Sequence, residues 1–176
     1  LDRVVIGPAR ESLFPAAALD SAVEAIERSA RLQIDRLIRI GAEEAARSLE
    51  ERTNRNLERL LEGIHFPGID QYKPFFYERL HTLLDYVDET QVILVDEPAR
   101  VREQVTAHGA DFAERQALQL EKGRVLPDQE KLLASWNDIY ERLKGGHALY
   151  LSGLAKRVAG MEPTAVIPVE AKSPES

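Results

Sequence analysis

Asp96 and Glu97 are the two residues whose type and position could do chemistry. They directly follow four apolar residues, 92–95, three of which are β-branched. This pattern predicts a strand buried on both faces, as at the centre of a parallel sheet, with both carboxylates at its carboxyl end. In open α/β sheets, ligands bind and reactions take place at the carboxyl ends of the strands. An apolar strand ending in Asp-Glu is typical of the Walker B motif, in which the Asp holds magnesium and the Glu positions the attacking water.

The nucleotide-binding interpretation also needs a phosphate-binding loop of the form G-x-x-x-x-G-K-[ST]. The 176 residues contain no such loop. We therefore interpret Asp96 and Glu97 as a degenerate Walker B-like pair, and we expect no catalytic residue, cofactor or metal ion in this chain. An explanation without chemistry is that the two carboxylates cap the helix that follows and stabilise its positive end.

Composition narrows the function classes further. A net charge of −7 and a pI near 5.2 argue against strong direct nucleic-acid binding, which needs clustered Lys and Arg. The absence of Cys excludes disulfides, thiolate catalysis and Cys-based zinc sites, and the four His residues lack metal-ligand spacing. No apolar run approaches the roughly 20 residues of a membrane span. We expect a cytoplasmic protein without membrane contact, and the single Met, at 161, suggests a piece of a longer chain.

Residues 16–64 carry apolar side chains mostly at three- and four-residue steps, which predicts a long amphipathic helical segment. Acid-first pairs at i,i+4, such as Glu24 with Arg28, favour a solvated opposite face. Gly41 or the polar stretch 53–56 could divide the segment, and the sequence leaves this open. A surface helix packed along its own domain is favoured over a lever or partner-binding segment.

Five aromatic residues fall between Tyr72 and Tyr86. Stacking platforms for nucleic-acid bases normally lie in positively charged grooves, whereas the neighbours here include several carboxylates. The cluster is therefore expected to form a small separate core with Tyr hydroxyl groups at its edge.

Helix-breaking and helix-capping residues predict the remaining elements. Pro98 suits the first position of a helix over 99–122, with a possible break at Gly109 and a stop at Gly123. Asp128 is the expected N-cap of the next helix, which carries an apolar stripe over 132–143. Trp136, a member of that stripe, is expected to be a packing anchor. Further short strands are expected at 3–7, 148–152 and 165–169.

The order of several short motifs resembles the N-terminal region of bacterial transcription-repair coupling factors (Mfd). These motifs are GPARE at 7–11, GIDQY at 68–72, LLDY at 83–86, ILVDEPAR at 93–100 and LEKG at 120–123. The resemblance covers nearly the whole chain. It extends more distantly to the excision-repair helicase subunit UvrB, which shares the arrangement of the LxDY and Asp-Glu motifs.

The resemblance implies a helix-rich α/β fold, a partial RecA/helicase-like lobe with a short, mainly parallel sheet and a long helical arm. It corresponds to the second half of a UvrB-like lobe, after the inserted UvrA-binding domain. The expected division is a strand and turn at 1–15, the helical segment at 16–64, the α/β segment at 65–170 and a polar tail at 171–176. A lobe built from two separated stretches leaves sheet edges and apolar faces open, which favours association or marginal stability of this piece alone.

The function implied by the resemblance is a non-catalytic module that scaffolds UvrA recruitment in transcription-coupled nucleotide excision repair. In such factors a later motor binds ATP, magnesium and DNA and pushes on RNA polymerase. The implied partners are other domains of the same protein, and UvrA and RNA polymerase through the parent protein. Two departures from the motifs of active helicases support a degenerate ATP site. Pro98-Ala99 replaces a Ser-His pair, and Ser152-Gly153-Leu154 stands where helicase motif III carries Ser-Ala-Thr.

Two alternatives remain open. The chain could be half of an active UvrB-like ATPase lobe whose phosphate loop lies upstream, which requires a usable Glu97 and a functional Ser152 hydroxyl. It could also be an unrelated helical adaptor in which Asp96 and Glu97 only cap a helix.

Overall fold

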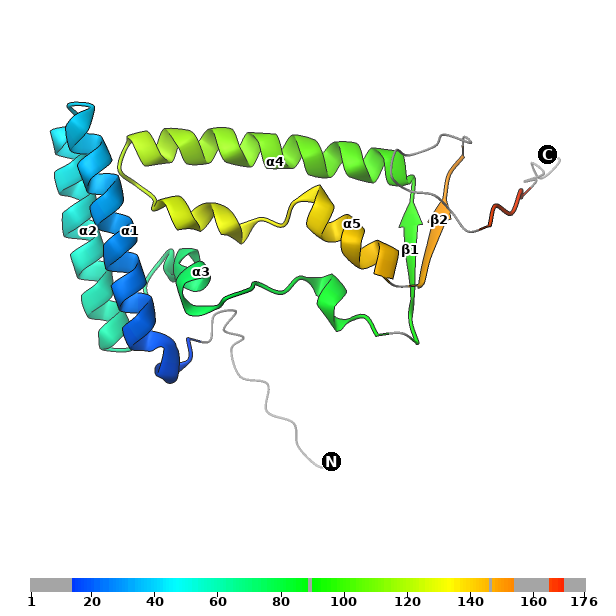
Figure 1. The fold of residues 1–176 in the computed structure, drawn as a ribbon, viewed down its shortest axis with the longest axis horizontal. Coiled ribbons are helices and arrows are strands. Elements are labelled where there is room, and N and C mark those ends of the chain that lie inside the picture. Colours follow the sequence, from blue (N-terminus) through cyan, green and yellow to red (C-terminus); the bar gives the residue numbers. More distant parts are fainter. Residues whose placement is uncertain (1–13, 89, 146, 154–164, 170–176) are drawn as a thin grey trace, which may run out of the picture.

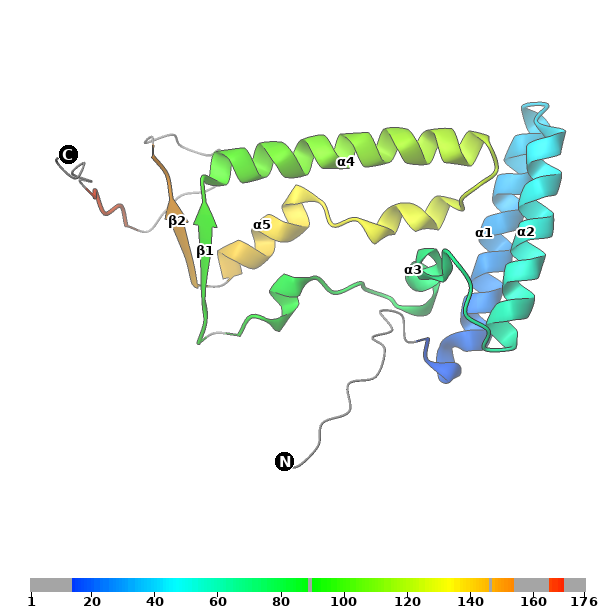
Figure 2. The same cartoon turned by 180° about the vertical axis from the view of Figure 1, so that it is seen from behind.

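The computed structural model of the chain describes residues 14–88, 90–145, 147–153 and 165–169. Two helices, α1 (Leu19–Arg39) and α2 (Glu43–Leu61), form a hairpin at one end of the molecule. Two strands, β1 (Val92–Asp96) and β2 (His147–Leu151), form a small sheet at the other end. The long helix α4 (Pro98–Glu121) runs between the two ends (Figure 1). The view from behind shows the same separation (Figure 2).

The hairpin forms because both helices carry an apolar stripe and a short turn brings the two stripes together. The short 3₁₀ helix η1 (Ala16–Ala18) leads into α1. The turn lies at Gly41, which has a φ of 78°, and the N–H of Ala42 donates to the carbonyl oxygen of Leu37 at 2.8 Å. Only glycine adopts this backbone conformation without strain. The predicted helical segment is thus divided at Gly41, and the polar stretch 53–56 lies inside the continuous helix α2.

After α2 the chain folds back against the hairpin and completes its core. Gly63, with a φ of 69°, follows the end of the helix, and the short helices η2 (Ile69–Tyr72) and α3 (Lys73–Phe76) then pack against α1 and α2. The members of this core with less than 10% exposure are Ala22, Ile26, Ala30, Leu37, Ala46, Leu49, Leu57, Leu60, Phe66, Ile69, Tyr72, Phe76 and Leu126.

The prediction of a separate aromatic core is therefore wrong. Tyr72 and Phe76 belong to the main core because the turn at 67–68 folds their segment back onto the hairpin. The Tyr72 hydroxyl does lie at an edge, where Asn56 donates a hydrogen bond to it at 2.9 Å. Tyr86, by contrast, is 79% exposed and joins no core.

Helix α4 is continuous through Gly109 and shows little burial beyond Pro98 at its first position. It therefore acts as a connection between the two ends more than as a core element. The helix ends at the predicted place, where Gly123 adopts a φ of 60° against the backbone of Ala45. Among the helices of the described residues, none combines the length and apolarity needed to cross a lipid bilayer.

The prediction that Asp128 caps the next helix is wrong. Asp128 lies within the 3₁₀ helix η4 (Pro127–Leu132), where it accepts a hydrogen bond from Ser29 at 2.7 Å and pairs with Lys131. An extended residue, Leu133, separates this turn from α5 (Trp136–Gly145). The N–H of Ser135 instead donates to the Asp138 carboxylate at 2.8 Å at the start of α5. The long-range bond to α1 thus overrides the local capping preference of Asp128.

The sheet is parallel, and Leu94 pairs with Leu149. Its inner face packs against α5 and the start of α4 through a cluster centred on the buried Val95 and Leu143, which also includes Trp136, the expected anchor. The outer face carries the large apolar side chains of Val92, Leu94, Leu149 and Leu151, which are 67%, 59%, 50% and 44% exposed. The prediction of burial on both faces is therefore wrong for this chain, because the described residues supply a helical layer on one face only.

Two further predicted strands have different outcomes. Residues 165–169 adopt no strand and are exposed, so that prediction is wrong. The strand at 3–7 and the polar tail at 171–176 lie outside the described residues. The architecture still confirms the expected class, a helix-rich fold with a short parallel sheet.

Candidate functional site

The candidate site lies at the carboxyl ends of the two strands. Because the strands are parallel and Asp96 pairs with Leu151, the residues after both strands meet at one edge of the sheet. The ladder continues one residue further, since the N–H of Glu97 donates to the carbonyl oxygen of Leu151 at 2.8 Å. The structure therefore brings together Asp96, Glu97 and Ser152, the three residues that the sequence singled out.

The Glu97 carboxylate is bound to the end of β2. Its Oε1 accepts a hydrogen bond from the backbone N–H of Gly153 at 2.7 Å, and the Ser152 hydroxyl lies 3.5 Å from its Oε2. A Cβ atom at Gly153 would lie 3.2 Å from the same Oε1, so glycine allows this close approach. The Asp96 side chain is exposed. Leu154, the third residue of the motif III-like triplet, lies outside the described residues.

The backbone of Glu97 is strained. Its φ and ψ are 48° and 64°, and within the described chain it is the sole residue other than glycine with a positive φ. Such a conformation costs about 1–2 kcal/mol for a residue with a Cβ atom. Its carbonyl oxygen accepts the N–H groups of Arg100 and Val101 at 2.8 and 3.1 Å, which starts α4. The strained turn changes the chain direction from strand to helix within one residue.

The helix-capping explanation of the carboxylates holds only in part. Glu97 occupies the N-cap position of α4, but its side chain makes no capping hydrogen bond. The carboxylate is turned toward β2 instead. Its negative charge still lies near the positive end of the helix, where it is favourable.

A magnesium–nucleotide site would need more ligands than this edge provides. Within the described residues, His, Asp and Glu side chains do not gather in groups of three or more that could hold a metal ion. The two carboxylates at positions 96 and 97 have no phosphate-binding loop beside them in this sequence. The described residues at this edge therefore do not by themselves form a magnesium–nucleotide site.

Asp85 is a structurally important residue to which the sequence analysis assigned no role of its own. It lies in the short helix η3 (Leu83–Tyr86), just before β1, and its side chain is 13% exposed. It accepts the backbone N–H of Thr82 at 2.6 Å and pairs with Arg79 at 3.0 Å and with Arg142 of α5. The LxDY motif thus joins the segment before β1 to the helix that covers the sheet. The motif could indicate Asp85, but its pairing with Arg142, more than fifty residues later, could not be read from spacing.

These contacts shift the titration of Asp85. Desolvation acts to raise the pKa of this carboxyl group, but the hydrogen bonds from Thr82 and the positive charges of Arg79 and His81 outweigh it. The pKa of Asp85 therefore lies below its usual value of 3.8.

No protein-family model matches the chain. It is 27% identical over 176 residues to the transcription-repair-coupling factor of Bacillus subtilis (strain 168), a match that covers 100% of this chain and 14% of the relative. It is 33% identical over 127 residues to UvrABC system protein B of Chlorobium phaeobacteroides, covering 69% of this chain and 18% of that protein. It is 31% identical over 128 residues to UvrABC system protein B of Natronomonas pharaonis, covering 70% and 19%.

The chain spans less than one fifth of the length of each of these relatives. The matches agree with the resemblance carried by the order of its motifs and with a partial helicase-like lobe. The chain is thus homologous to a UvrB-like segment of transcription-repair-coupling factors and of UvrABC system protein B.

Proposed function

We propose that this chain is a non-catalytic structural module of a nucleotide excision repair protein of the transcription-repair coupling type. The observation that carries the proposal is the use of Glu97 as a bridge between two strand ends. In an active Walker B motif the corresponding Glu presents its carboxylate to the attacking water. Here Oε1 is engaged by the Gly153 N–H, and the Ser152 hydroxyl lies near Oε2.

A structural role for Glu97 also accounts for its strained backbone. Strained conformations persist only where the surrounding structure over-determines them. The ladder bond to Leu151 and the bond from Gly153 both act on this one residue and fix the two strand ends relative to each other. The same contacts would resist the movement that motif III of an active helicase makes between nucleotide states.

The outer face of the sheet supports the scaffolding part of the proposal. Parallel sheets are normally covered on both faces, yet the four large apolar side chains of the outer face are at least 44% exposed. Burial of each such side chain contributes about 1.5–3 kcal/mol before entropy is counted. We infer that other parts of the parent protein cover this face and complete the lobe.

The remaining elements of the proposal concern the parent protein. They are UvrA recruitment through the inserted domain, contact with RNA polymerase, an ATP- and magnesium-dependent motor acting on DNA in later domains, and a cytoplasmic location. The similarity to a transcription-repair-coupling factor and to UvrABC system protein B supports the repair context. The domain division at residues 15, 64 and 170 also stays a prediction.

The test uses the intact parent protein with the phosphate loop of its later motor inactivated, so that remaining ATP turnover belongs to this lobe. ATP hydrolysis is compared between the parent, Glu97→Gln, and Glu103→Gln as a matched control at an exposed position of α4. We expect no turnover that depends on Glu97. Turnover abolished by Glu97→Gln and kept in Glu103→Gln would overturn the proposal and establish the active UvrB-like ATPase alternative.

A further inference from the structure

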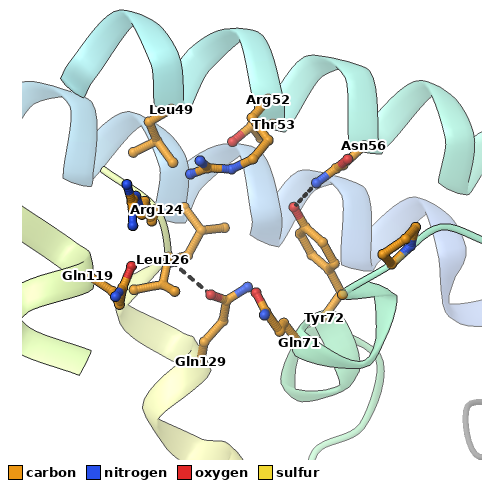
Figure 3. Close-up of a pocket in the computed structure, with 13 residues that line it drawn as sticks. Leu49, Arg52, Thr53, Asn56, Gln71, Tyr72, Gln119, Arg124, Leu126 and Gln129 are labelled. Carbon is orange, nitrogen blue, oxygen red and sulfur yellow. Dashed lines mark hydrogen bonds between the residues drawn. The ribbon is translucent and has the colours of Figure 1, made fainter. Parts of the chain in front are cut away.

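A pocket of about 430 Å³ opens at the hairpin end of the molecule, away from the strand-end site (Figure 3). It lies between α2, the turn at 67–72, the end of α4 and the segment that leads into η4. Its principal polar lining residues are Arg52, Asn56, Gln71, Gln119, Arg124 and Gln129. None of the strand-end residues takes part, so the pocket is independent of the function proposed above.

The charge of the lining is one-sided. Arg52 and Arg124 both line the pocket, and no carboxylate among the described residues does, although the chain as a whole carries a net charge of −7. Burial lowers the pKa of the Arg52 guanidinium, and the nearby charges of Arg124 and Arg55 act in the same direction. These guanidinium groups repel one another, and an anion between them would relieve that repulsion.

Several side chains that line the pocket still have hydrogen-bond donors to offer a ligand. Gln129 accepts the N–H of Leu126 with its Oε1 at 3.0 Å (Figure 3). The amino group of the same side chain is the donor that it can offer to the pocket. Asn56 donates to the Tyr72 hydroxyl at 2.9 Å, so the hydroxyl hydrogen must find another acceptor. Arg52 donates one N–H to the carbonyl oxygen of Gly123, and a guanidinium carries five such donors.

The shape and surroundings of the pocket favour a single oxyanion group over a long polyanion. Four separate segments of the chain line it, and the acidic chain around it would repel an extended nucleic-acid backbone. The planar fork of a guanidinium matches the paired oxygens of a carboxylate or a phosphate. Arg124 is exposed, whereas the guanidinium of Arg52 is held in place by its hydrogen bond to the carbonyl oxygen of Gly123.

We propose that this pocket binds one phosphate or carboxylate group, presented by a small ligand or by an acidic side chain, with Arg124 as the residue that contacts it. Arg52 supplies a second positive charge from a fixed position. The amide side chains of Gln71, Gln119 and Gln129 surround the bound group.

The test is an NMR titration of the uniformly ¹⁵N-labelled 176-residue chain at constant ionic strength. One arm uses inorganic phosphate, and the other uses a blocked tetraglutamate peptide. We expect saturable shifts of the backbone amides of Gly68, Gln71 and Arg124 in at least one arm. The arm with the tighter binding identifies whether phosphate or carboxylate is the source of the anion.

Three variants separate specific binding from general charge. Arg124→Gln is expected to weaken binding about tenfold or more, as expected for loss of a charge-assisted contact. Arg124→Lys, which keeps the charge but not the fork, is expected to fall between that variant and the unmodified chain. Arg36→Gln removes an exposed charge on α1, which does not line the pocket, and is expected to leave binding unchanged.

Several outcomes would overturn the proposal. One is the lack of saturable binding of either probe up to roughly 10 mM. Another is equal weakening by Arg124→Gln and Arg36→Gln, which would indicate binding to net charge alone. A third is stronger binding of a single-stranded oligonucleotide than of either probe at the same sites. Because the Arg124 side chain is exposed, its substitutions should leave the circular dichroism spectrum unchanged.

Discussion

The two ends of this molecule differ in how far the chain completes its own packing. At the hairpin end, Ile26, Leu37 and Leu49 are fully buried by side chains that all come from this chain. At the sheet end, the buried cluster consists of Val95 and Leu143 with partly buried neighbours, and the outer face of the sheet is open. The main core and the candidate site therefore lie at opposite ends of the molecule.

The difference follows from chain connectivity. A helical hairpin closes through a short turn, so its two apolar stripes find each other within about fifty residues. A parallel sheet needs crossover connections and a helical layer on each face. In the described residues, one crossover through α4 and α5 supplies one such layer.

The largest expected effect tests the comparison directly. Leu37→Ala removes a fully buried side chain and should lower the free energy of unfolding by about 2–5 kcal/mol. Leu94→Ala, on the open face of the sheet, should change it by about 0.5 kcal/mol or less. Urea denaturation of both variants measures the contrast. A large loss in Leu94→Ala would mean that the outer face is covered in solution, as in a self-associated chain.

Gly123 gives a second test at the place where α4 meets the hairpin. An added Cβ atom would collide with the carbonyl oxygen of Ala45, and the residue has a φ of 60°. Gly123→Ala should therefore lower the free energy of unfolding by at least about 2 kcal/mol, from backbone strain and overpacking together.

Gly41→Ala is the matched control for Gly123→Ala. Gly41 has a φ of 78°, but no atom lies within 4 Å of its added Cβ. Only the backbone strain remains, about 1–2 kcal/mol. Equal losses in the two variants would show that the added Cβ atom at position 123 meets no steric cost from the backbone of Ala45.

Asp85 gives the smallest expected effect and tests the sheet end by pH. Its pKa is lower in the folded chain than its usual value of 3.8, so ionised Asp85 stabilises the fold above that pH. This contribution is lost as the pH falls through the lowered pKa. Asp85→Asn should lower the urea midpoint at neutral pH and reduce the loss of stability on acidification.

The control for the pH experiment is Asp111→Asn, at an exposed position of α4. It should leave both the neutral midpoint and the acid dependence as in the unmodified chain. Some acid dependence will remain in Asp85→Asn, because hydrogen bonds also lower the pKa values of Asp88 and Asp138. An unchanged acid dependence in Asp85→Asn would rule out its ion pairs as a source of stability at the sheet end.

Much of the local structure could be predicted from sequence because it depends on neighbouring residues. The apolar steps at 16–64, the four apolar residues before Asp96, Pro98 at the start of α4 and Gly123 after its end all act within one or two turns. The identities of Asp96, Glu97 and Ser152 as strand-end residues followed from the same local patterns. Parallel pairing then brought them to one edge of the sheet.

The failed predictions share a different cause. Asp128 has the side chain of a helix cap, but its bond to Ser29, ninety-nine residues earlier in the chain, placed it elsewhere. The aromatic segment joined the main core because a turn folded it back onto the hairpin. The binding pocket was not foreseen, because its lining comes from four segments that no spacing rule connects.

The sequence by itself determined the helices, the strand before Asp96 and the motif order that relates this chain to its relatives. Periodicity, proline and glycine act locally, and they leave the same signal whatever the tertiary context. Only the tertiary structure decided that the Glu97 carboxylate binds the end of β2, that one face of the sheet stays open and that Arg52 and Arg124 face one pocket. These contacts join residues far apart in the chain, and their partners are set by packing.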